Sequence, residues 1–242
     1  MEVRLDILRH ASKGGGAFLQ SFIYQAVEAS ETVATALAAL NERAELRDVD
    51  GNSAAPIRWE CNCLQKKCGA CAMVINGRPA LACGVKLADC GKKIRLEPLK
   101  KFPVVADLVV DRSVMYQNLE TLRLWLADST SIEEGSTESA YDTSRCLQCG
   151  CCLEVCPNFF SGGTFTGMAS AVPMARLLSE LPASQKREAS QLYRRHIYEG
   201  CGKSLACRNV CPAKIDIDRI LVNSNAVAVW KRYFQRQEGG SE

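Results

Sequence analysis

Residues 146–157 read CLQCGCCLEVCP, a segment with cysteines at the spacing C-x2-C-x2-C-x3-C and a proline after the last of them. Residues 201–212, CGKSLACRNVCP, repeat this spacing, except that Ser204 takes the place of the second cysteine. Densely spaced thiols in a reducing compartment are more often metal ligands than disulfides. The two segments therefore predict a region organised around sulfur-ligated metal.

Both segments have the spacing of bacterial ferredoxins, in which the fourth cysteine of one run ligates the cluster of the other run. This crossing rule gives a set of four thiolates for a 4Fe–4S cluster: Cys146, Cys149, Cys152 and Cys211. It leaves a set of three thiolates: Cys156, Cys201 and Cys207. Three thiolates predict a 3Fe–4S cluster, and the alternative is a fourth iron bound through the oxygen of Ser204.

A third group of cysteines stands earlier in the chain: Cys63, Cys68, Cys71 and Cys83. The gaps of four and two residues between the first three are those of plant-type 2Fe–2S proteins, in which one loop supplies three thiolates. Gly69 lets the backbone approach the inorganic sulfides, which attract N–H donors. Zinc is the alternative, but structural zinc sites usually use paired C-x2-C knuckles, so the spacing favours an iron–sulfur cluster.

Three of the fourteen cysteines remain, namely Cys61, Cys90 and Cys151. Cys151 lies inside a ligand run and is predicted to be a small buried packing residue. Cys61 precedes Cys63 by two residues, so it is either a spare ligand or, as we expect, a non-ligand near the cluster. Cys90 has no partner at ligand spacing and is predicted to be an ordinary thiol.

The composition is that of an average globular protein. The chain has 242 residues, of which 47% are hydrophobic and 24% charged, so wholesale disorder is excluded. A formal net charge of +3 is too small to argue for nucleic-acid binding. The sequence shows neither an apolar stretch of the ~20 residues that span a bilayer nor a signal peptide. We therefore expect a cytosolic chain, or one that is peripheral on the cytoplasmic side of the cell membrane.

The N-terminal part has the patterns of a small α+β domain. Alternation predicts strands over 1–9 and 18–25, joined as a hairpin across a glycine-rich break. A helix is expected over 31–43 with Ser30 as its N-cap. Residues 72–75 and 80–82 flank Asn76-Gly77-Arg78, a hairpin signal, and 94–97 reads as a further strand.

After Pro103 the pattern becomes helical. Helices are predicted over 104–110, 114–126, 169–181, 185–199 and 217–236, and the polar stretch 128–143 is predicted to be an exposed linker. The boundary between the two domains is expected near residues 100–112. We accordingly divide the chain into domains over 1–105 and 106–242.

Three further motifs accompany the cysteine groups: FPVVADLVVDRS (102–113), CGACAM (68–73) and CGCC (149–152). With the order of the groups, they resemble the iron–sulfur subunit of the succinate dehydrogenase/fumarate reductase family over nearly the whole chain. The resemblance implies an N-terminal β-grasp domain of the plant-type 2Fe–2S ferredoxin class, followed by an all-α ferredoxin domain. It also implies a flavoprotein partner with FAD and a dicarboxylate site, and a membrane anchor with quinone or haem.

In that arrangement the 2Fe–2S cluster faces the flavin, the 3Fe–4S cluster faces the quinone, and the 4Fe–4S cluster lies between them. The resemblance thus implies an electron-transfer subunit with no catalytic residue of its own, in a complex that oxidises succinate or reduces fumarate. One alternative is a subunit of a soluble fumarate reductase that uses a thiol or another non-quinone donor. A zinc-binding interaction module is the other.

Two departures from the family pattern stand out. The family loop usually reads Cys-Arg-Glu-Gly-x-Cys, whereas Lys66 stands here in the place of the glycine. If that place needs a positive φ, Lys66 costs roughly 1 kcal/mol. Lys66 and Lys67 either stabilise the reduced cluster, meet an acidic partner surface, or form a solvated basic pair.

The second departure concerns the quinone side. Ubiquinone-linked members carry tryptophans after the first Cys-Pro and a histidine after the next cysteine, where this chain has NFFS (158–161) and GKS (202–204). This difference favours a quinone of the menaquinone type or an atypical electron partner. Phe159 and Phe160 are expected either to line that interface or to pack in the core.

Overall fold

The chain forms two units in the computed structural model, which describes residues 1–10, 16–125 and 137–230. The sheet unit comprises Met1–Arg112 together with Cys149–Glu154. The helical unit comprises Ser113–Gln148 and Val155–Glu242. No helix in the described ranges is long and apolar enough to cross a bilayer.

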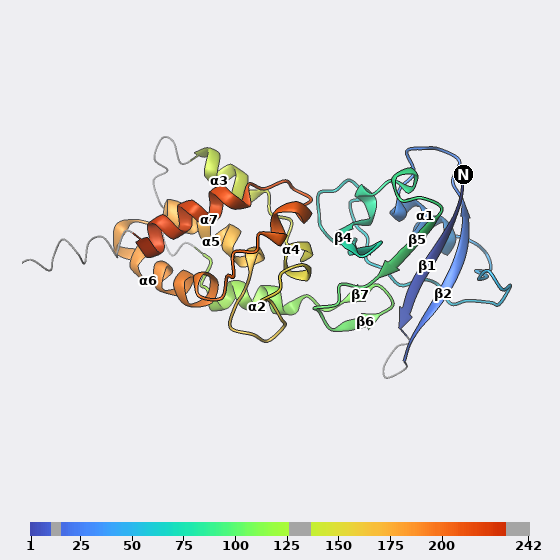
Figure 1. Ribbon diagram of the computed structural model, residues 1–242, viewed down its shortest axis with the longest axis horizontal. Coiled ribbons are helices and arrows are strands. Elements are labelled where there is room, and N and C mark those ends of the chain that lie inside the picture. Colours follow the sequence, from blue (N-terminus) through green and yellow to red (C-terminus); the bar gives the residue numbers. More distant parts are fainter. Residues whose placement is uncertain (11–15, 126–136, 231–242) are drawn as a thin grey trace, which may run out of the picture. The chain divides into compact units, whose positions relative to one another are not determined.

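The sheet unit contains a mixed five-stranded sheet (Figure 1). Its strands are β1 (Glu2–His10), β2 (Ala17–Gln25), β3 (Ala72–Ile75), β4 (Arg78–Leu81) and β5 (Lys93–Glu97). They lie in the order β2-β1-β5-β3-β4, in which β1 and β5 are parallel and the other neighbours are antiparallel. Both predicted hairpins and the predicted strand at β5 are confirmed.

Local sequence explains these strands. Val3, Leu5 and Ile7 alternate along β1 and are fully buried, which is the pattern of a strand with one face on the core. The β3–β4 connection is two residues long, and both Asn76 (φ 49°) and Gly77 (φ 79°) have positive φ. Such a connection matches the twist of a hairpin, and asparagine and glycine are the residues that adopt it most readily.

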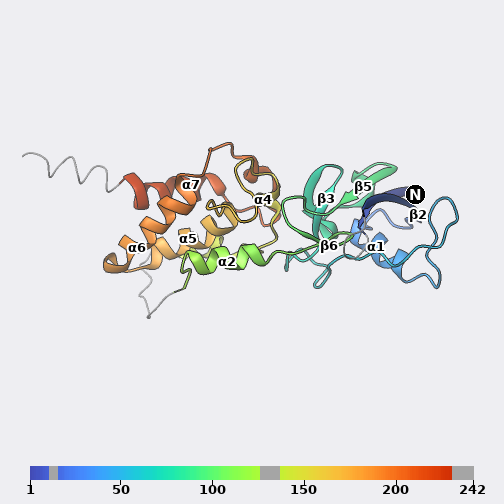
Figure 2. The same ribbon diagram turned by 90° about the horizontal axis from the view of Figure 1, so that it is seen from below.

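Helix α1 (Val33–Asn41) lies against one face of the sheet (Figure 2). Its buried residues are Val33, Ala34, Ala36, Leu37 and Leu40. The N-cap is Thr32, whose hydroxyl accepts from the N–H of Thr35 while the hydroxyl of Thr35 accepts from the N–H of Thr32. The prediction of Ser30 as the cap was wrong, because Ser30 instead donates to the carboxylate of Glu28 at 3.0 Å.

The helix predicted over 104–110 was also wrong. These residues form two short antiparallel strands, β6 (Val104–Ala106) and β7 (Val109–Val110). Asp107 turns the chain between them with φ 46°, and its carboxylate accepts from the N–H groups of His10 at 3.1 Å and Arg58 at 2.9 Å. The β-branched valines and these long-range bonds favour extended backbone over a helix.

The helical unit is arranged around α5 (Met168–Glu180), which runs through its middle (Figures 1 and 2). Helix α5 contacts α2 (Ser113–Thr121), α3 (Thr137–Ser144), α6 (Ala183–Tyr193) and α7 (Ile217–Asn225). Turns of π-helix extend α6 and α7, as η3 (Arg194–Tyr198) and η5 (Ala226–Trp230). The short helix η4 (Ala206–Val210) also belongs to this unit, whereas α4 (Cys151–Glu154), η1 (Ala82–Gly84) and η2 (Leu87–Asp89) belong to the sheet unit.

The helices predicted over 169–181 and 185–199 are confirmed, as is that over 217–236 up to Trp230, where the described residues end. The helix predicted over 114–126 ends early at Thr121, because Arg123 has φ 50°. The predicted linker 128–143 was wrong from Thr137 onward, where α3 begins, and residues 128–136 lie outside the described ranges.

Candidate iron–sulfur cluster sites

The sheet unit brings together the four cysteines of the first group. Cys63, Cys68 and Cys71 lie in the loop before β3, and Cys83 lies in η1 directly after β4. The sulfur atoms of Cys71 and Cys83 are 3.4 Å apart, and the thiol of Cys68 lies near enough to Cys63 to help lower the pKa of Cys63. The thiols therefore form two neighbouring pairs.

Backbone N–H groups of the same loop point at these sulfurs. The N–H groups of Gln65 and Lys67 each donate to Sγ of Cys63 at 3.3 Å, and the N–H of Lys66 donates to Sγ of Cys83 at 3.3 Å. Positive φ angles at Leu64 (53°) and Lys66 (60°) turn the chain so that successive N–H groups face inward. The position of Lys66 is thus one that suits glycine.

Hydrogen-bond donors lower the pKa of one thiol of this group, whereas burial raises the pKa of another. The N–H groups of Gln65 and Lys67 lower the pKa of Cys63 to about 7. Burial, together with the neighbouring thiols of Cys83 and Cys68, raises the pKa of Cys71 to about 12. Hydrogen-bonded thiolates are what an iron–sulfur cluster requires of its ligands.

The donor set fits a binuclear cluster. Two pairs of thiols match a cluster with two irons, whereas a structural zinc site gathers four ligands around one ion.

Arg112 supports the loop, because its guanidinium donates to the carbonyl of Ala70 at 2.9 Å and pairs with Glu60 at 3.1 Å. The sequence reading did not single out Arg112.

In the helical unit, a hydrogen bond links the start of the first ferredoxin run to the end of the second. The guanidinium of Arg145 donates to the carbonyl of Ala213. Arg145 directly precedes Cys146, and Ala213 follows Cys211 by two residues. The bond therefore holds the segments of Cys146 and Cys211 side by side, as the crossing rule expects. The other two members of that predicted set, Cys149 and Cys152, belong to the sheet unit.

A second bond links the end of the first run to the start of the second. The amide of Asn158 donates to the carbonyl of Gly200 at 2.7 Å, next to Cys156 and Cys201 respectively. Burial and the neighbouring thiols of Cys156 and Cys201 raise the pKa of Cys207 to about 11. The thiols of Cys156 and Cys201 therefore act electrostatically on the thiol of Cys207. Ser204 is exposed, in a loop where both adjacent residues have φ 55°.

The three cysteines outside the predicted ligand sets occupy different surroundings. Cys151 is fully buried in α4, as expected of a packing residue. Cys61 is exposed. Cys90 is partly buried, and burial together with Asp89 raises the pKa of its thiol.

One residue of the first run contacts a predicted ligand and was missed by the sequence reading. The side-chain amide of Gln148 donates to Sγ of Cys146 at 3.3 Å and to the carbonyl of Ala169 in α5 at 2.9 Å. Only Pro173 could have signalled this contact, because a proline inside a helix leaves a carbonyl one turn earlier without its usual donor.

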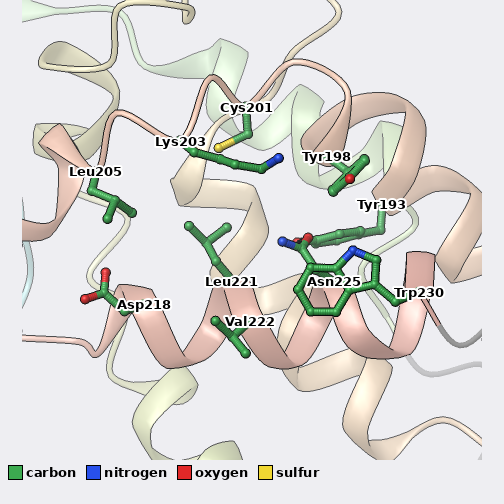
Figure 3. Close-up of a pocket in the computed structure, with 10 residues that line it drawn as sticks. All are labelled: Tyr193, Tyr198, Cys201, Lys203, Leu205, Asp218, Leu221, Val222, Asn225 and Trp230. Atoms are coloured by element: carbon green, nitrogen blue, oxygen red, sulfur yellow. Dashed lines mark hydrogen bonds between the residues drawn. The ribbon is translucent and has the colours of Figure 1, made fainter.

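A cavity of about 250 Å³ adjoins Cys201 in the helical unit (Figure 3). Cys201 and Lys203 lie on one side of it and Val222 on the other (Figure 3). The lining residues are Tyr193, Tyr198, Cys201, Lys203, Leu205, Asp218, Leu221, Val222, Asn225 and Trp230. The ammonium of Lys203 lies 5.1 Å from the ring centroid of Tyr198, a cation–π distance. The walls are thus mainly apolar, with Lys203 and Asp218 as the charged residues.

Phe159 and Phe160 were expected either to line the interface with the electron partner or to pack in the core. Phe159 is buried in the core, whereas Phe160 is exposed.

Comparison with known proteins supports the division between the two kinds of cluster. Residues 4–117 match the 2Fe–2S iron–sulfur cluster binding domain family, and residues 142–215 match the 4Fe–4S dicluster domain family. A chain of the Mycobacterium smegmatis Sdh1 complex in the apo form shares the fold, with a TM-score of 0.76 over 96% of this chain and 97% of that chain at 22% identity. The predicted α+β fold, with a 2Fe–2S domain before a helical ferredoxin domain, is confirmed.

Two curated relatives carry the family assignment. The succinate dehydrogenase iron–sulfur subunit of Bacillus subtilis (strain 168) is 36% identical over 181 residues, which cover 70% of this chain and 71% of that protein. The fumarate reductase iron–sulfur subunit of Escherichia coli O6:H1 is 28% identical over 178 residues, 69% of this chain and 72% of that protein. This chain therefore belongs to the family of iron–sulfur subunits of succinate dehydrogenase and fumarate reductase.

Proposed function

We propose that this chain carries electrons between the FAD of a dicarboxylate-handling flavoprotein and a quinone at a membrane anchor. It would do so as the subunit of a succinate:quinone or quinol:fumarate oxidoreductase that binds no substrate itself. The observation that carries the proposal is the grouping of thiols, with four around the loop before β3 and the two ferredoxin runs tied to each other by Arg145 and Asn158.

The proposed ligands follow the three groups. Those of the 2Fe–2S cluster are Cys63, Cys68, Cys71 and Cys83. Those of the 4Fe–4S cluster are Cys146, Cys149, Cys152 and Cys211, and those of the 3Fe–4S cluster are Cys156, Cys201 and Cys207. When bound, these clusters would supply one-electron transfer, a chemistry that no side chain of the set performs alone.

The contribution of the chain is to hold the thiolates and to set their electrostatics. The N–H groups of Gln65, Lys66 and Lys67 offset negative charge on the sulfurs of Cys63 and Cys83. Burial of Cys71 keeps water from its sulfur, and Cys207 is partly buried. Hydrogen bonding and burial are the means by which a protein tunes the potential of such a site.

The apolar cavity beside Cys201 supports an apolar electron partner on that side of the helical unit. We infer a quinone of the menaquinone type, because the tryptophans and the histidine of ubiquinone-linked members are replaced by NFFS (158–161) and GKS (202–204). We also infer a peripheral position on the cytoplasmic face of the cell membrane, reached through a separate anchor subunit.

The test is purification of the native complex and an assay with succinate and fumarate, each with high- and low-potential quinones. We expect a co-purified flavoprotein and anchor, quinone-linked activity with the low-potential quinone, and about nine irons per chain on this ligand assignment. Dye-linked activity without any quinone-linked activity would point to a non-quinone donor. A colourless protein with zinc and no iron would contradict the proposal altogether.

A further inference from the structure

Pro173 creates an unusual acceptor in α5. It lies inside the helix and has no N–H, so the carbonyl of Ala169, four residues earlier, has no helical donor. Ala169 is only 3% exposed, which leaves little access for water. A buried carbonyl without a donor is costly, so a side chain that reaches it is held there firmly.

The side chain that reaches it is Gln148. Its Nε2 donates to the Ala169 carbonyl at 2.9 Å and to Sγ of Cys146 at 3.3 Å. A primary amide has two N–H hydrogens, so one serves the carbonyl and the other serves the sulfur. Because the first bond cannot be given up cheaply, the second is fixed in direction.

Gln148 holds this place at a cost. Its backbone has φ 48°, a conformation that glycine adopts with less strain. Its Oε1 atom is buried and has no hydrogen-bond partner among the described residues. Neither feature stabilises the turn, so the favourable contacts of the Gln148 side chain are those made by its two N–H donors.

We propose that Pro173, by leaving the Ala169 carbonyl free, positions the Gln148 amide on Cys146 and thereby raises the reduction potential of the cluster that Cys146 ligates. This rests on the proposed function in that Cys146 is taken as a 4Fe–4S ligand. A donor on a thiolate sulfur favours the reduced cluster, because reduction adds negative charge to the site. Pro173 acts only as a positioning residue.

The experiment is a potentiometric titration of the full-length, cluster-loaded chain, followed by electron paramagnetic resonance. Gln148→Leu removes both donors and should lower the equilibrium constant for reduction of the 4Fe–4S cluster roughly threefold to tenfold, where tenfold is 59 mV for a one-electron couple. Pro173→Ala restores the helical donor to Ala169 and releases the amide. Pro173→Ala should lower the potential of the 4Fe–4S cluster by less than Gln148→Leu does. It should also raise the thermal midpoint of unfolding, because alanine completes the hydrogen bonds of α5.

Two comparisons separate this effect from general damage. Gln117→Leu makes the same change at an exposed position of α2 and should leave every potential unchanged. The 2Fe–2S signal should keep its potential in all variants. If Gln148→Leu does not retain the cluster, the 4Fe–4S potential of Pro173→Ala alone tests the proposal, because that substitution leaves the loop of Cys146 unchanged.

An unchanged 4Fe–4S potential in Pro173→Ala overturns the proposal, and so does a fall of equal size in Gln117→Leu. Failure of the proposed function is distinguishable in the wild-type chain: a wrong cluster assignment would leave no reduced 4Fe–4S signal, and a wrong electron partner would leave the signal and its potential shifts in place.

Discussion

Arg9 and Asp107 form a buried ion pair, with Nε of Arg9 2.9 Å from Oδ1 of Asp107 and both side chains 5% exposed. The pair joins β1 to the turn between β6 and β7. Arg9 also donates to the carbonyls of Ala55 at 3.2 Å and Pro56 at 3.1 Å, so it connects the segment before the first cysteine loop to the sheet.

This pair predicts a loss of stability in acid. Burial alone would raise the pKa of Asp107, but Arg9 and the N–H groups of Arg58 and His10 outweigh it and hold the pKa below its ordinary value. A carboxylate with a lowered folded pKa stabilises the protein above the unfolded value of about 3.9. That contribution is lost as the pH falls through the folded pKa.

Asp107→Asn should therefore cost about 3 kcal/mol at pH 7, because it leaves Arg9 buried without its counter-charge. The difference from wild type should shrink as the pH falls below about 4 and through the lowered folded pKa of Asp107, as measured by urea unfolding. Asp50→Asn, at an exposed site, is the control and should change little. A difference that stays constant with pH would show that the pair carries no net charge effect.

Lys66→Gly should stabilise the chain by about 0.5 kcal/mol. The left-handed conformation at φ 60° costs a residue with a side chain ~1–2 kcal/mol, while glycine adds up to ~1 kcal/mol of unfolded-state entropy. Lys67 does not have positive φ, so Lys67→Gly should instead be destabilising. Denaturant midpoints of the two variants measure the effect, and the reverse order would refute the strain at Lys66.

Cys61, Cys90 and Cys151 should be dispensable for cluster assembly, since the other eleven cysteines complete the three proposed sets. Alanine at each position should leave the iron content unchanged. Cys151→Ala should lower the thermal midpoint, because the side chain is fully buried. Loss of the 2Fe–2S signal in Cys61→Ala would mean that the loop of Cys63 is wrongly assigned.

Ser204→Cys should convert the three-thiolate site to a 4Fe–4S site. The new thiolate stands at the place equivalent to Cys149 in the first run and would supply the missing ligand. We expect the oxidised 3Fe–4S signal to disappear, a reduced 4Fe–4S signal to appear, and electron exchange with quinone to weaken. Dye-linked activity on the flavin side should persist.

The measurement that tests this prediction is the spectrum of the oxidised 3Fe–4S cluster. An unchanged 3Fe–4S spectrum in Ser204→Cys would mean that the repeat does not describe the ligand geometry. Ser204→Ala is the matched control, because it removes the hydroxyl without adding a ligand. It should leave the spectrum as in the wild type.

Patterns of short range predicted most of what the structure contains. The alternation of Val3, Leu5 and Ile7 defines β1, and Asn76-Gly77 defines the β3–β4 turn, because both depend on neighbours in the chain. The loop that carries Cys63, Cys68 and Cys71 likewise follows from spacing within a short segment, whereas the three ligand sets remain a prediction.

Two of the misses came from contacts between distant residues, and the third, at the cap of α1, was local. Residues 104–110 have apolar spacing that suits either a helix or a strand, and the decision lies with Asp107 and its partners on β1. Gln148 is unremarkable in the sequence until α5 brings the Ala169 carbonyl to it. Thr32 was preferred to Ser30 as a cap because Thr35 completes the reciprocal pair of hydrogen bonds.

The bonds from Arg145 to Ala213 and from Asn158 to Gly200 pair each end of one ferredoxin run with the opposite end of the other. On the proposed ligand sets, the 3Fe–4S set is complete only once translation has passed residue 207, and the 4Fe–4S set only once it has passed residue 211. The 2Fe–2S loop, by contrast, has all four once residue 83 has left the ribosome. The proposed ligand sets are therefore completed in order from the N-terminus, and a product that ends between residues 83 and 207 would contain only the 2Fe–2S set complete.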